Sequence, residues 1–482
     1  MDGAAKVFFP LAIASSIAVA ICIVTGNLLA AVCITFIPLL IITMGLAFIN
    51  RIYAFLLLFT ISYFISVMWH YVYMDSLGVI LDAAIGFNLL VIVTSFLTDK
   101  PHIRNLSVDL LIIIGIWTLY CTAEIFNPRM LEPKAWMSSI RSMALYFLLI
   151  TILVQLTVKD FHQARTILAL WSVLVLISFA KVLYQKYVGW TVGDRYFLYA
   201  LDGKRTHLIY YGTRYFSIFT DAANFGGSMG MALVVFLAVG IHTKNKRKKL
   251  YYWFVAAAAC YGMFVSGTRS ALAVPIAGVF VYLALMRDMK KMIPTAILAA
   301  IGLFLLGFTD IGNSNSTIRR ARTAFHREED PSYIGRKENQ AKLREIMEDM
   351  PMGNSLGMSG GRAHKYGDFS PLTEIPTDSW FVQLWVETGI IGQLIYFFMM
   401  GFIFIKGAII IFFRLKKPEI RGICAGMLAG VAGLFVMSSN NEVFTQLPNS
   451  VIVYTLIAIV FMSEKLEKIE DDLDNNGKLQ RV

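Results

Sequence analysis

The residues IIGQLIYFFMMGFIFIKGAIIIFF, Ile390 to Phe413, form an apolar block that decides the fold class of this chain. Their only charged residue is Lys406, and about 20 apolar residues are enough for an α-helix to cross a bilayer. Similar blocks recur along the chain, in which 57% of the 482 residues are hydrophobic and only 16% are charged. Soluble globular proteins carry roughly 45–50% apolar and about 25% charged residues. The sequence therefore predicts an all-α, polytopic transmembrane helical bundle and excludes a series of soluble domains.

Charged and polar breaks divide the apolar residues into about 12–14 predicted helices. The predicted spans are residues 7–24, 28–48, 52–69, 79–97, 108–123, 142–156, 166–184, 215–241, 251–266, 271–286, 293–308, 379–413, 422–438 and 447–462. Residues 1–309 would hold helices 1–11 and residues 379–462 helices 12–14. Between them lies a large hydrophilic loop, 310–378, and residues 463–482 form a polar tail.

Lysine and arginine fix the predicted orientation, because short basic loops stay on the cytoplasmic side of a membrane. The strongest signal is the segment KNKRKK at 244–249. Counting spans outward from it puts the other short basic loops on the same side. Both termini are then cytoplasmic and the 310–378 loop lies outside.

The outward segments also carry many basic residues, part of a net charge of +11. Long loops cross the membrane largely regardless of charge, so these residues do not overturn the topology. They predict an anionic partner outside the membrane, such as a phosphate group or an acidic glycan. Within the loop, residues 333–350 have the pattern of an amphipathic helix. It is interpreted as a membrane-surface or lid element, with an independently packed segment as the alternative.

Several common catalytic motifs are absent from the sequence. It has no phosphate-binding loop of the Gly-rich, Lys-Ser/Thr type, no zinc-ligand pair at helical spacing and no Ser/His/Asp pattern. The seven histidines are scattered. We therefore expect no metal site, and polar groups at helix ends become the candidates for chemistry.

The segment from Arg214 to Gly227 enters a predicted span from the outer face and carries Asp221 and Asn224 into apolar surroundings. Polar residues in a membrane are costly, and they indicate function by default. The alternative is that Asp221 pairs with a nearby arginine and simply closes a helix end.

A second candidate is Arg269, in the tight turn Ser266-Gly267-Thr268-Arg269-Ser270 between two spans. An arginine fixed at the outer interface can hold a phosphate through two parallel hydrogen bonds. The alternative is an interfacial arginine whose long side chain reaches the headgroup region.

The third candidate segment runs from Asp378 to Gly392 and begins the span after the large loop. Asp378 would lie at the outer surface, where it could also be a helix N-cap. Glu387 would lie roughly 13 Å further inward, so its carboxyl must be protonated, paired or turned to a polar cavity. Gly389 and Gly392 are expected to permit close helix approach.

In this order, and flanking a large outward loop, these segments resemble the bacterial O-antigen ligase/polymerase superfamily. Arg214 to Asn224 resembles the family's Arg, Gly/Ser-x-Phe, Asn segment, and Ser266 to Ser270 its Ser-Arg-Gly/Ser-Ala turn. Asp378 to Gly392 is similar to its His-Asn-x-x-Leu, Glu-x-Gly-x-x-Gly segment. The chain departs from the pattern by placing Asp378 and Ser379 where the family's ligases have histidine and asparagine. Asp378 ranks first as the catalytic residue by position, and alternatives in the same loop are His364, Asp368 and Glu374.

The resemblance implies a GT-C-like glycosyltransferase in the bacterial inner membrane. Such an enzyme moves a glycan from undecaprenyl diphosphate to an acceptor hydroxyl at the periplasmic face, without a metal or cofactor. Ligation to lipid A–core is the favoured reaction, while polymerisation of repeat units and transfer to a protein hydroxyl stay open. Membrane lipids are expected partners and nucleic acid is not. The implied roles are diphosphate binding by Arg214, Arg269 and Arg336, catalysis by Asp378 and Glu387, and support by Asp221 and Asn224.

A protein of another class, a transporter or flippase for lipid-linked glycans, is the alternative hypothesis. Asp82, Lys181 and Glu387 are ionisable residues inside predicted spans, as transport pathways require. Transporters are often built from paired halves with ligands near the midplane. Here the charged candidates gather instead at one predicted face and in one asymmetric loop.

Overall fold

The structure is a computed structural model that describes residues 40–71, 78–98, 106–209, 212–286 and 331–479, with a few isolated residues between 287 and 330. The helices are α3 (Ile52–Tyr71), α4 (Gly78–Thr98), α5 (Val108–Ala123), α6 (Pro133–Ile140), α7 (Tyr146–Thr157), α8 (Phe161–Tyr187), α9 (Val192–Arg195), α10 (Lys204–His207), α11 (Ala222–His242), α12 (Lys246–Val265), α13 (Ala273–Met286), α16 (Pro331–Met347), α17 (Gly360–His364), α18 (Pro371–Glu374), α19 (Trp380–Ile409), α20 (Pro418–Met437) and α21 (Asn449–Leu479). A further apolar helix covers Leu40–Ile49. Two short antiparallel strands, β1 (Leu208–Ile209) and β2 (Gly212–Thr213), pair with each other.

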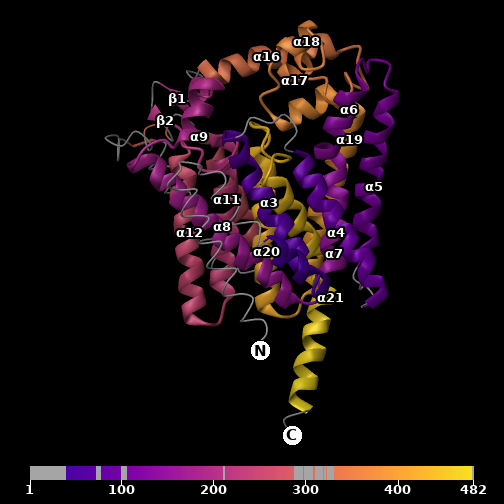
Figure 1. Cartoon of the computed structure of the whole chain (residues 1–482), viewed down its shortest axis with the longest axis vertical. Coiled ribbons are helices and arrows are strands. Elements are labelled where there is room, and N and C mark those ends of the chain that lie inside the picture. The colour runs from indigo at the N-terminus through magenta and orange to yellow at the C-terminus, as the bar shows by residue number, and fades with distance from the viewer. Residues whose placement is uncertain are drawn as a thin grey trace.

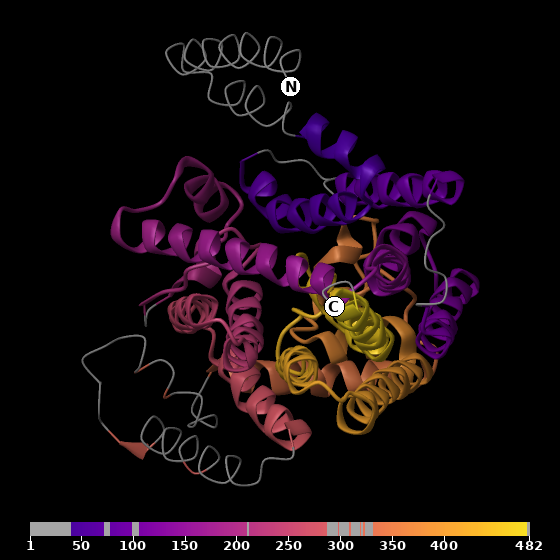
Figure 2. The same cartoon turned by 90° about the horizontal axis from the view of Figure 1, so that it is seen from below.

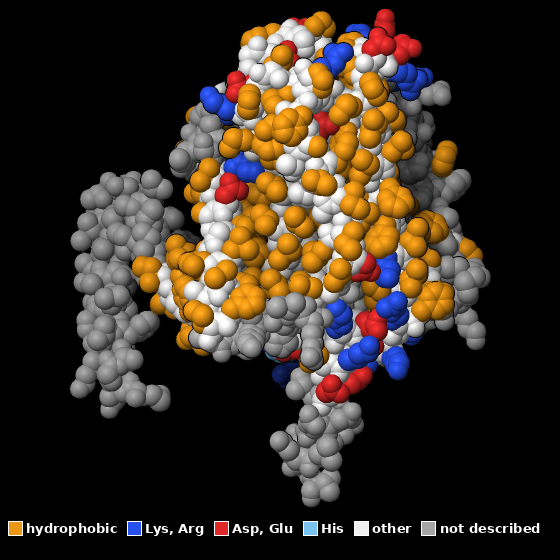
Figure 3. Space-filling model, turned by 90° about the vertical axis from the view of Figure 1, so that its right-hand side faces the viewer, with side chains coloured by type: hydrophobic (Ala, Val, Ile, Leu, Met, Phe, Trp, Pro, Cys, Tyr) orange, Lys and Arg blue, Asp and Glu red, His pale blue; other side chains and the backbone are white. Residues whose placement is uncertain are grey.

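Within the described ranges, nine helical segments are long and apolar enough to cross a membrane. Figure 3 shows a broad band of hydrophobic side chains over the middle of one face, with most charged side chains near its upper and lower ends. This arrangement suits a lipid-facing belt, because no water in the bilayer core can solvate charge or open backbone. The protein is a multi-pass, all-α membrane protein, which confirms the predicted fold class.

The predicted spans correspond closely to the observed helices. Span 7–24, nearly all of span 293–308 and most of span 28–48 lie outside the described residues. Spans 52–69 and 251–266 correspond to α3 and α12, which are not among the nine. In α12 the first turn holds Lys246 to Lys249, which shortens its apolar part.

Helices α11, α20 and α21 form the most enclosed part of the bundle, and most of their residues are buried. Figure 2, which looks along the bundle, shows α21 near its middle with other helices around it. Close packing depends on small residues. A side-chain carbon at Gly433 of α20 would lie only 2.2 Å from the Val274 carbonyl oxygen of α13. Small residues let helix backbones approach in this way inside membranes.

Among the helix boundaries that differ from the prediction, two have clear physical causes. The span predicted from residue 215 begins only at Ala222, because Asp221 caps α11 and Ser217 has the left-handed φ of 55°. At the other end of the chain, α21 continues through the predicted polar tail as far as Leu479. Its acidic residues are used in packing: Glu467 accepts the backbone N–H groups of Lys416 and Lys417.

The loop segments gather at one end of the bundle. In Figure 1, α16, α17 and α18 lie at the top, near the level of α9 and the two strands, while the C-terminal end of α21 is at the bottom. We call the upper part the loop-rich end. The predicted outward segments that the structure describes all meet there, which is the arrangement that a site on one membrane face requires.

Candidate active site

A cavity of about 490 Å³ lies at the loop-rich end. Four separate parts of the chain form it: α10, the start of α11, the end of the large loop, and the connection between α20 and α21. Its polar lining residues are Thr206, Asp221, Ser359, Thr377, Asp378, Asn441, Glu442 and Gln446. The cavity therefore offers three carboxyl groups, those of Asp221, Asp378 and Glu442, at the boundary between the loops and the helical bundle.

Asp378 enters this cavity from a backbone position that few residues adopt. Its φ is 55°, in the left-handed region, which aspartate and asparagine tolerate better than other non-glycine residues. The N-cap of α19 is the next residue, Ser379, whose Oγ accepts the Val382 N–H at 3.2 Å. Asp378 is thus not the cap itself, and its carboxyl is left to face the cavity.

Helix α16, the predicted amphipathic helix, lies beside Asp378. Asn339 of α16 donates from Nδ2 to the Asp378 carboxylate at 3.5 Å. The apolar face of the helix packs on α18 and α19, through a cluster that includes Leu343, Met347, Leu372 and Val386. The helix is therefore anchored on the transmembrane bundle next to Asp378, as a lid element would be, and it carries Arg336 about one turn before Asn339.

Arg214 is held just before α11 by neutral groups. Its Nη1 donates to the Thr206 carbonyl oxygen at 3.1 Å and its Nη2 to Thr268 Oγ1 at 3.0 Å. Its buried Nε has no hydrogen-bond acceptor among the described residues. Burial lowers the pKa of Arg214, Asp221 raises it, and the positive charges of Arg269 and Arg336 lower it. The charges of both other predicted arginines therefore act on Arg214, and we call these three residues the arginine cluster.

The turn that carries Arg269 joins this arginine cluster to the cavity. Thr268, which receives the Arg214 hydrogen bond, donates in turn to the Ala222 carbonyl oxygen at 3.0 Å. On the other side of Arg269, Ser270 Oγ donates to Asn441 Oδ1, and Asn441 lines the cavity. Since both other arginines of the cluster and the Asp221 carboxylate act on Arg214, an anionic ligand beside Arg214 would relieve the repulsion between the arginines.

Asp221 and Asn224 have clear structural contacts. Asp221 Oδ1 accepts the backbone N–H groups of Ala223 at 2.7 Å and Asn224 at 3.0 Å, as an N-cap does. Asn224 is fully buried and donates to the Leu447 carbonyl oxygen at 2.7 Å, while it accepts from Asn449 Nδ2 at 2.7 Å. Asp221 also lines the cavity. Asn224 instead ties α11 to the start of α21.

Glu387 is fully buried and does not line the cavity itself, but the glycine-rich part of the large loop is hydrogen-bonded to it. Its carboxylate accepts from Ser359 Oγ at 2.5 Å, from the Gly357 N–H at 3.0 Å and from Gln383 Nε2 at 3.0 Å. The sequence predicts that so deep a carboxyl is protonated, paired or turned to a polar cavity. In the structure it is paired with three hydrogen-bond donors. Because Ser359 itself lines the cavity, Glu387 positions one wall of the site.

The glycine-rich segment after α16 is buried against a break in α19. Gly389 has φ 66° inside α19, which interrupts the helix. The Asn354 N–H donates to the Val386 carbonyl oxygen at 2.8 Å, and Tyr120 of α5 donates to that of Thr388 at 2.8 Å. The break therefore leaves the carbonyl oxygens of Val386 and Thr388 available to a loop residue and to a neighbouring helix. Gly389 thus interrupts the helix, in addition to the close helix approach that the sequence predicts for it.

The three alternative catalytic residues lie elsewhere. Asp368 is buried and accepts the Ser370 N–H at 2.9 Å. The His364 ring stacks on Phe369 with ring centres 5.0 Å apart. Glu374 ends α18 and is exposed. None of these residues lines the cavity that holds Asp378.

Among the lining residues that were not predicted from the sequence are Asn441 and Glu442. Asn441 and Glu442 come from the connection between α20 and α21, and Thr377 Oγ1 donates to Glu442 Oε1. The only local signal was a polar stretch between two apolar spans. As for metal ligands, no group of three or more His, Cys, Asp or Glu side chains with a suitable arrangement occurs in the part of the chain that the structure describes.

The fold and the cavity together define a polytopic membrane protein with a polar site at one end of its helical bundle. Residues 254–397 match a protein-family model described as O-antigen ligase. This match confirms the resemblance to the O-antigen ligase/polymerase superfamily for that segment, which is less than a third of the chain and includes Arg269, Arg336 and Asp378. A comparison with curated proteins gave no match.

Proposed function

We propose that this protein is a membrane glycosyltransferase that moves a glycan from a polyprenyl diphosphate, undecaprenyl diphosphate in bacteria, to an acceptor hydroxyl at the loop-rich end. The observation that carries the proposal is the placement of predicted arginines around the cavity that Asp378 lines. Arg214 is hydrogen-bonded to the lining residue Thr206, and Arg269 precedes Ser270, which is hydrogen-bonded to the lining residue Asn441. The family-model match over residues 254–397 supports an O-antigen ligase-like activity.

In the proposed reaction the arginines stabilise the negative charge of the leaving diphosphate, and Asp378 takes the proton of the acceptor. The acceptor oxygen attacks the anomeric carbon of the donor sugar, and the bond from that carbon to the diphosphate oxygen breaks. Polyprenyl diphosphate leaves with the electron pair, and its growing negative charge is stabilised by the arginines. Asp378 accepts the proton of the acceptor hydroxyl. No metal or cofactor is needed in this scheme.

Glu387 is proposed as a positioning residue and not as a group that touches substrate. Its three hydrogen bonds fix Gly357 and Ser359, and through them one wall of the cavity. Asp221 holds the start of α11 and contributes its charge to the site, while Asn224 supports the fold there.

The acceptor is proposed to be lipid A–core, which would make the protein an O-antigen ligase of the bacterial inner membrane with a periplasmic site and cytoplasmic termini. Deletion of the gene, followed by electrophoresis of lipopolysaccharide and glycoproteins, tests this directly. Lost polysaccharide ladders with accumulated full-length lipid-linked polymer are expected. Single-repeat products would indicate a polymerase, lost protein glycosylation a protein O-oligosaccharyltransferase, and unchanged glycans would contradict the proposal.

The transporter hypothesis draws less support from the contacts of its candidate residues. Asp82 pairs with Arg141 at 2.6 Å and accepts from Tyr146 at 2.7 Å. Lys181 pairs with Asp194 at 2.8 Å. Since these residues and Glu387 are engaged within the protein, they are better suited to hold helices and loops than to bind a moving substrate.

Replacing Asp378 by asparagine should slow glycan transfer by about 10²–10⁴-fold if the carboxylate is the general base. Asparagine suits the substitution because it also tolerates a left-handed φ, so the main change is loss of the negative charge. Glu374→Gln, in the same loop but outside the cavity, is the matched control and should keep full activity. Equal activity of Asp378→Asn and Glu374→Gln would rule out Asp378 as the base.

A further inference from the structure

A second and larger cavity, of about 780 Å³, lies at the opposite end of the bundle from the candidate active site. Asp221 and Ala223, at the start of α11, line the first cavity, whereas Thr243 and Lys244, just after its end, line the second. A helix of 21 residues separates its ends by about 30 Å. The two cavities are therefore distinct sites on opposite sides of the membrane-spanning region.

The wall of this second cavity is strongly basic. Arg165, Lys244, Arg247 and Lys248 line it together with the single carboxylate Glu419. Arg165 is neutralised by Glu419 at 3.0 Å and by Glu470 at 2.9 Å. Among the described residues, by contrast, no carboxylate pairs with Lys244, Arg247 or Lys248, and all three are exposed. Three positive charges thus remain for a ligand.

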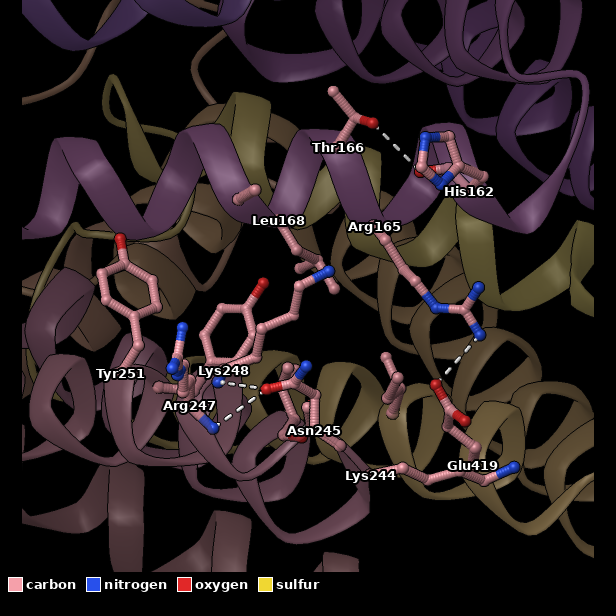
Figure 4. Close-up of a pocket in the computed structure, with 15 residues that line it drawn as sticks. His162, Arg165, Thr166, Leu168, Lys244, Asn245, Arg247, Lys248, Tyr251 and Glu419 are labelled. Carbon is pink, nitrogen blue, oxygen red and sulfur yellow. Dashed lines mark hydrogen bonds and ion pairs between the residues drawn. The ribbon is translucent and has the colours of Figure 1, made fainter.

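Figure 4 agrees with this difference between Arg165, which is paired with carboxylates, and the three other cations. Figure 4 shows the Arg165 side chain turned toward Glu419, whereas Lys248 extends from α12 toward α8. Asn245 caps α12 by accepting the backbone N–H groups of Arg247 at 2.9 Å and Lys248 at 3.2 Å. The cap fixes the turn that carries the cations, so the basic side chains start from an ordered backbone.

The cavity also has an apolar wall, beside polar lining residues that include His162, Thr166 and Thr243. Leu168, Val239 and Ile423 line it from α8, α11 and α20. Tyr251 also lines it, and its hydroxyl is hydrogen-bonded to Ser172 at 2.8 Å. Large exposed side chains lie nearby on the same helices, among them Ile241, Leu250 and Trp253. Tyrosine and tryptophan gather where a membrane meets water, so this cavity lies at the headgroup level.

We infer that this cavity binds the phosphate headgroup of an anionic membrane phospholipid, with an acyl chain against its apolar wall. The chemical group that the cavity would bind is a phosphodiester. Basic pockets between transmembrane helices hold such groups at the headgroup level. A free phosphate ion would use only the cations. The apolar wall and the neighbouring lipid-facing residues favour a lipid as the occupant.

A pair of double variants tests this site. Lys244→Gln/Lys248→Gln removes two lining charges, whereas Lys246→Gln/Lys249→Gln removes two charges from the same segment that do not line the cavity. Purified full-length proteins in neutral detergent are titrated with phosphatidylglycerol, phosphatidylcholine or inorganic phosphate. Bound lipid is counted by native mass spectrometry, and thermal unfolding is recorded in parallel.

The wild type and the Lys246/Lys249 control should bind phosphatidylglycerol in preference to phosphatidylcholine and gain thermal stability from it. The Lys244/Lys248 variant should bind it about 30-fold more weakly, because each interfacial lysine contributes about fivefold. Equal weakening in both variants would mean only diffuse surface attraction and would overturn the proposal. Stabilisation by inorganic phosphate at the same level would overturn it as well, by assigning the site to a free anion.

Discussion

Arg269→Ala and Arg214→Ala should each reduce glycan transfer by about 10²–10³-fold, the usual effect of removing a group that stabilises transition-state charge. Among the residues that the structure describes, the buried Nε of Arg214 has no acceptor, and its other nitrogens are held by Thr206 and Thr268. An oxygen of the leaving diphosphate would complete its hydrogen bonds. Initial rates of transfer from a lipid-linked donor, measured with membranes that contain equal amounts of each protein, check this expectation.

Arg195→Ala is the matched control, because Arg195 is exposed on α9 and does not line the cavity. It should retain wild-type activity. Arg269→Lys should recover only part of the rate, since lysine restores the charge but not the paired hydrogen bonds of a guanidinium. Full activity of both alanine variants would show that the arginine cluster is not the diphosphate site.

Gly389→Ala should destabilise the protein strongly and lower transfer activity with it. A side-chain carbon at Gly389 would lie 2.0 Å from the Pro351 carbonyl oxygen, and its φ is 66°. The left-handed backbone alone costs a non-glycine residue about 1–2 kcal/mol, and relief of the contact must displace the loop that Glu387 holds. Thermal unfolding in detergent should therefore shift to lower temperature.

Gly401→Ala provides the comparison within the same helix. Gly401 lies in α19, and a side-chain carbon there would meet no atom within 4 Å. Because alanine favours helix over glycine by roughly 0.5–1 kcal/mol, this variant should be as stable as the wild type or slightly more so. The account of the α19 break would be wrong if the two alanine variants unfolded at the same temperature.

The transmembrane helices could be predicted well from the sequence for a simple physical reason. A backbone in lipid must satisfy its own hydrogen bonds, so a long apolar block has little choice but to be a helix. The block from Ile390 to Phe413 is accordingly helical throughout, ending in a short π-helical turn at Ile410–Arg414. The ends of the helices were harder to predict, because they depend on capping residues. Helix α11 starts seven residues later than predicted because Asp221 provides its cap.

The candidate site was predicted only in part. Arg214, Arg269 and Asp378 could be recognised because each is a charged residue next to an apolar span, where charge is costly to bury. This pattern is visible in the local sequence. Glu442 did not stand out, since its place beside Asp378 depends on how the connection between α20 and α21 folds back. The helix break at Gly389 was also missed, because a glycine that permits close packing and one that adopts a positive φ look identical in sequence.

The most direct test of the central claim follows one lipid-linked glycan with the purified protein in vesicles. The donor carries one label on its glycan and another on its polyprenyl diphosphate, and an acceptor with a free hydroxyl is present. If the protein is a transferase, the two labels separate, with glycosylated acceptor and free polyprenyl diphosphate formed in equal amounts, and Arg269→Ala slows this separation by about 10²–10³-fold. Movement of the intact donor across the bilayer, with both labels still joined, would contradict a transferase and identify a transporter.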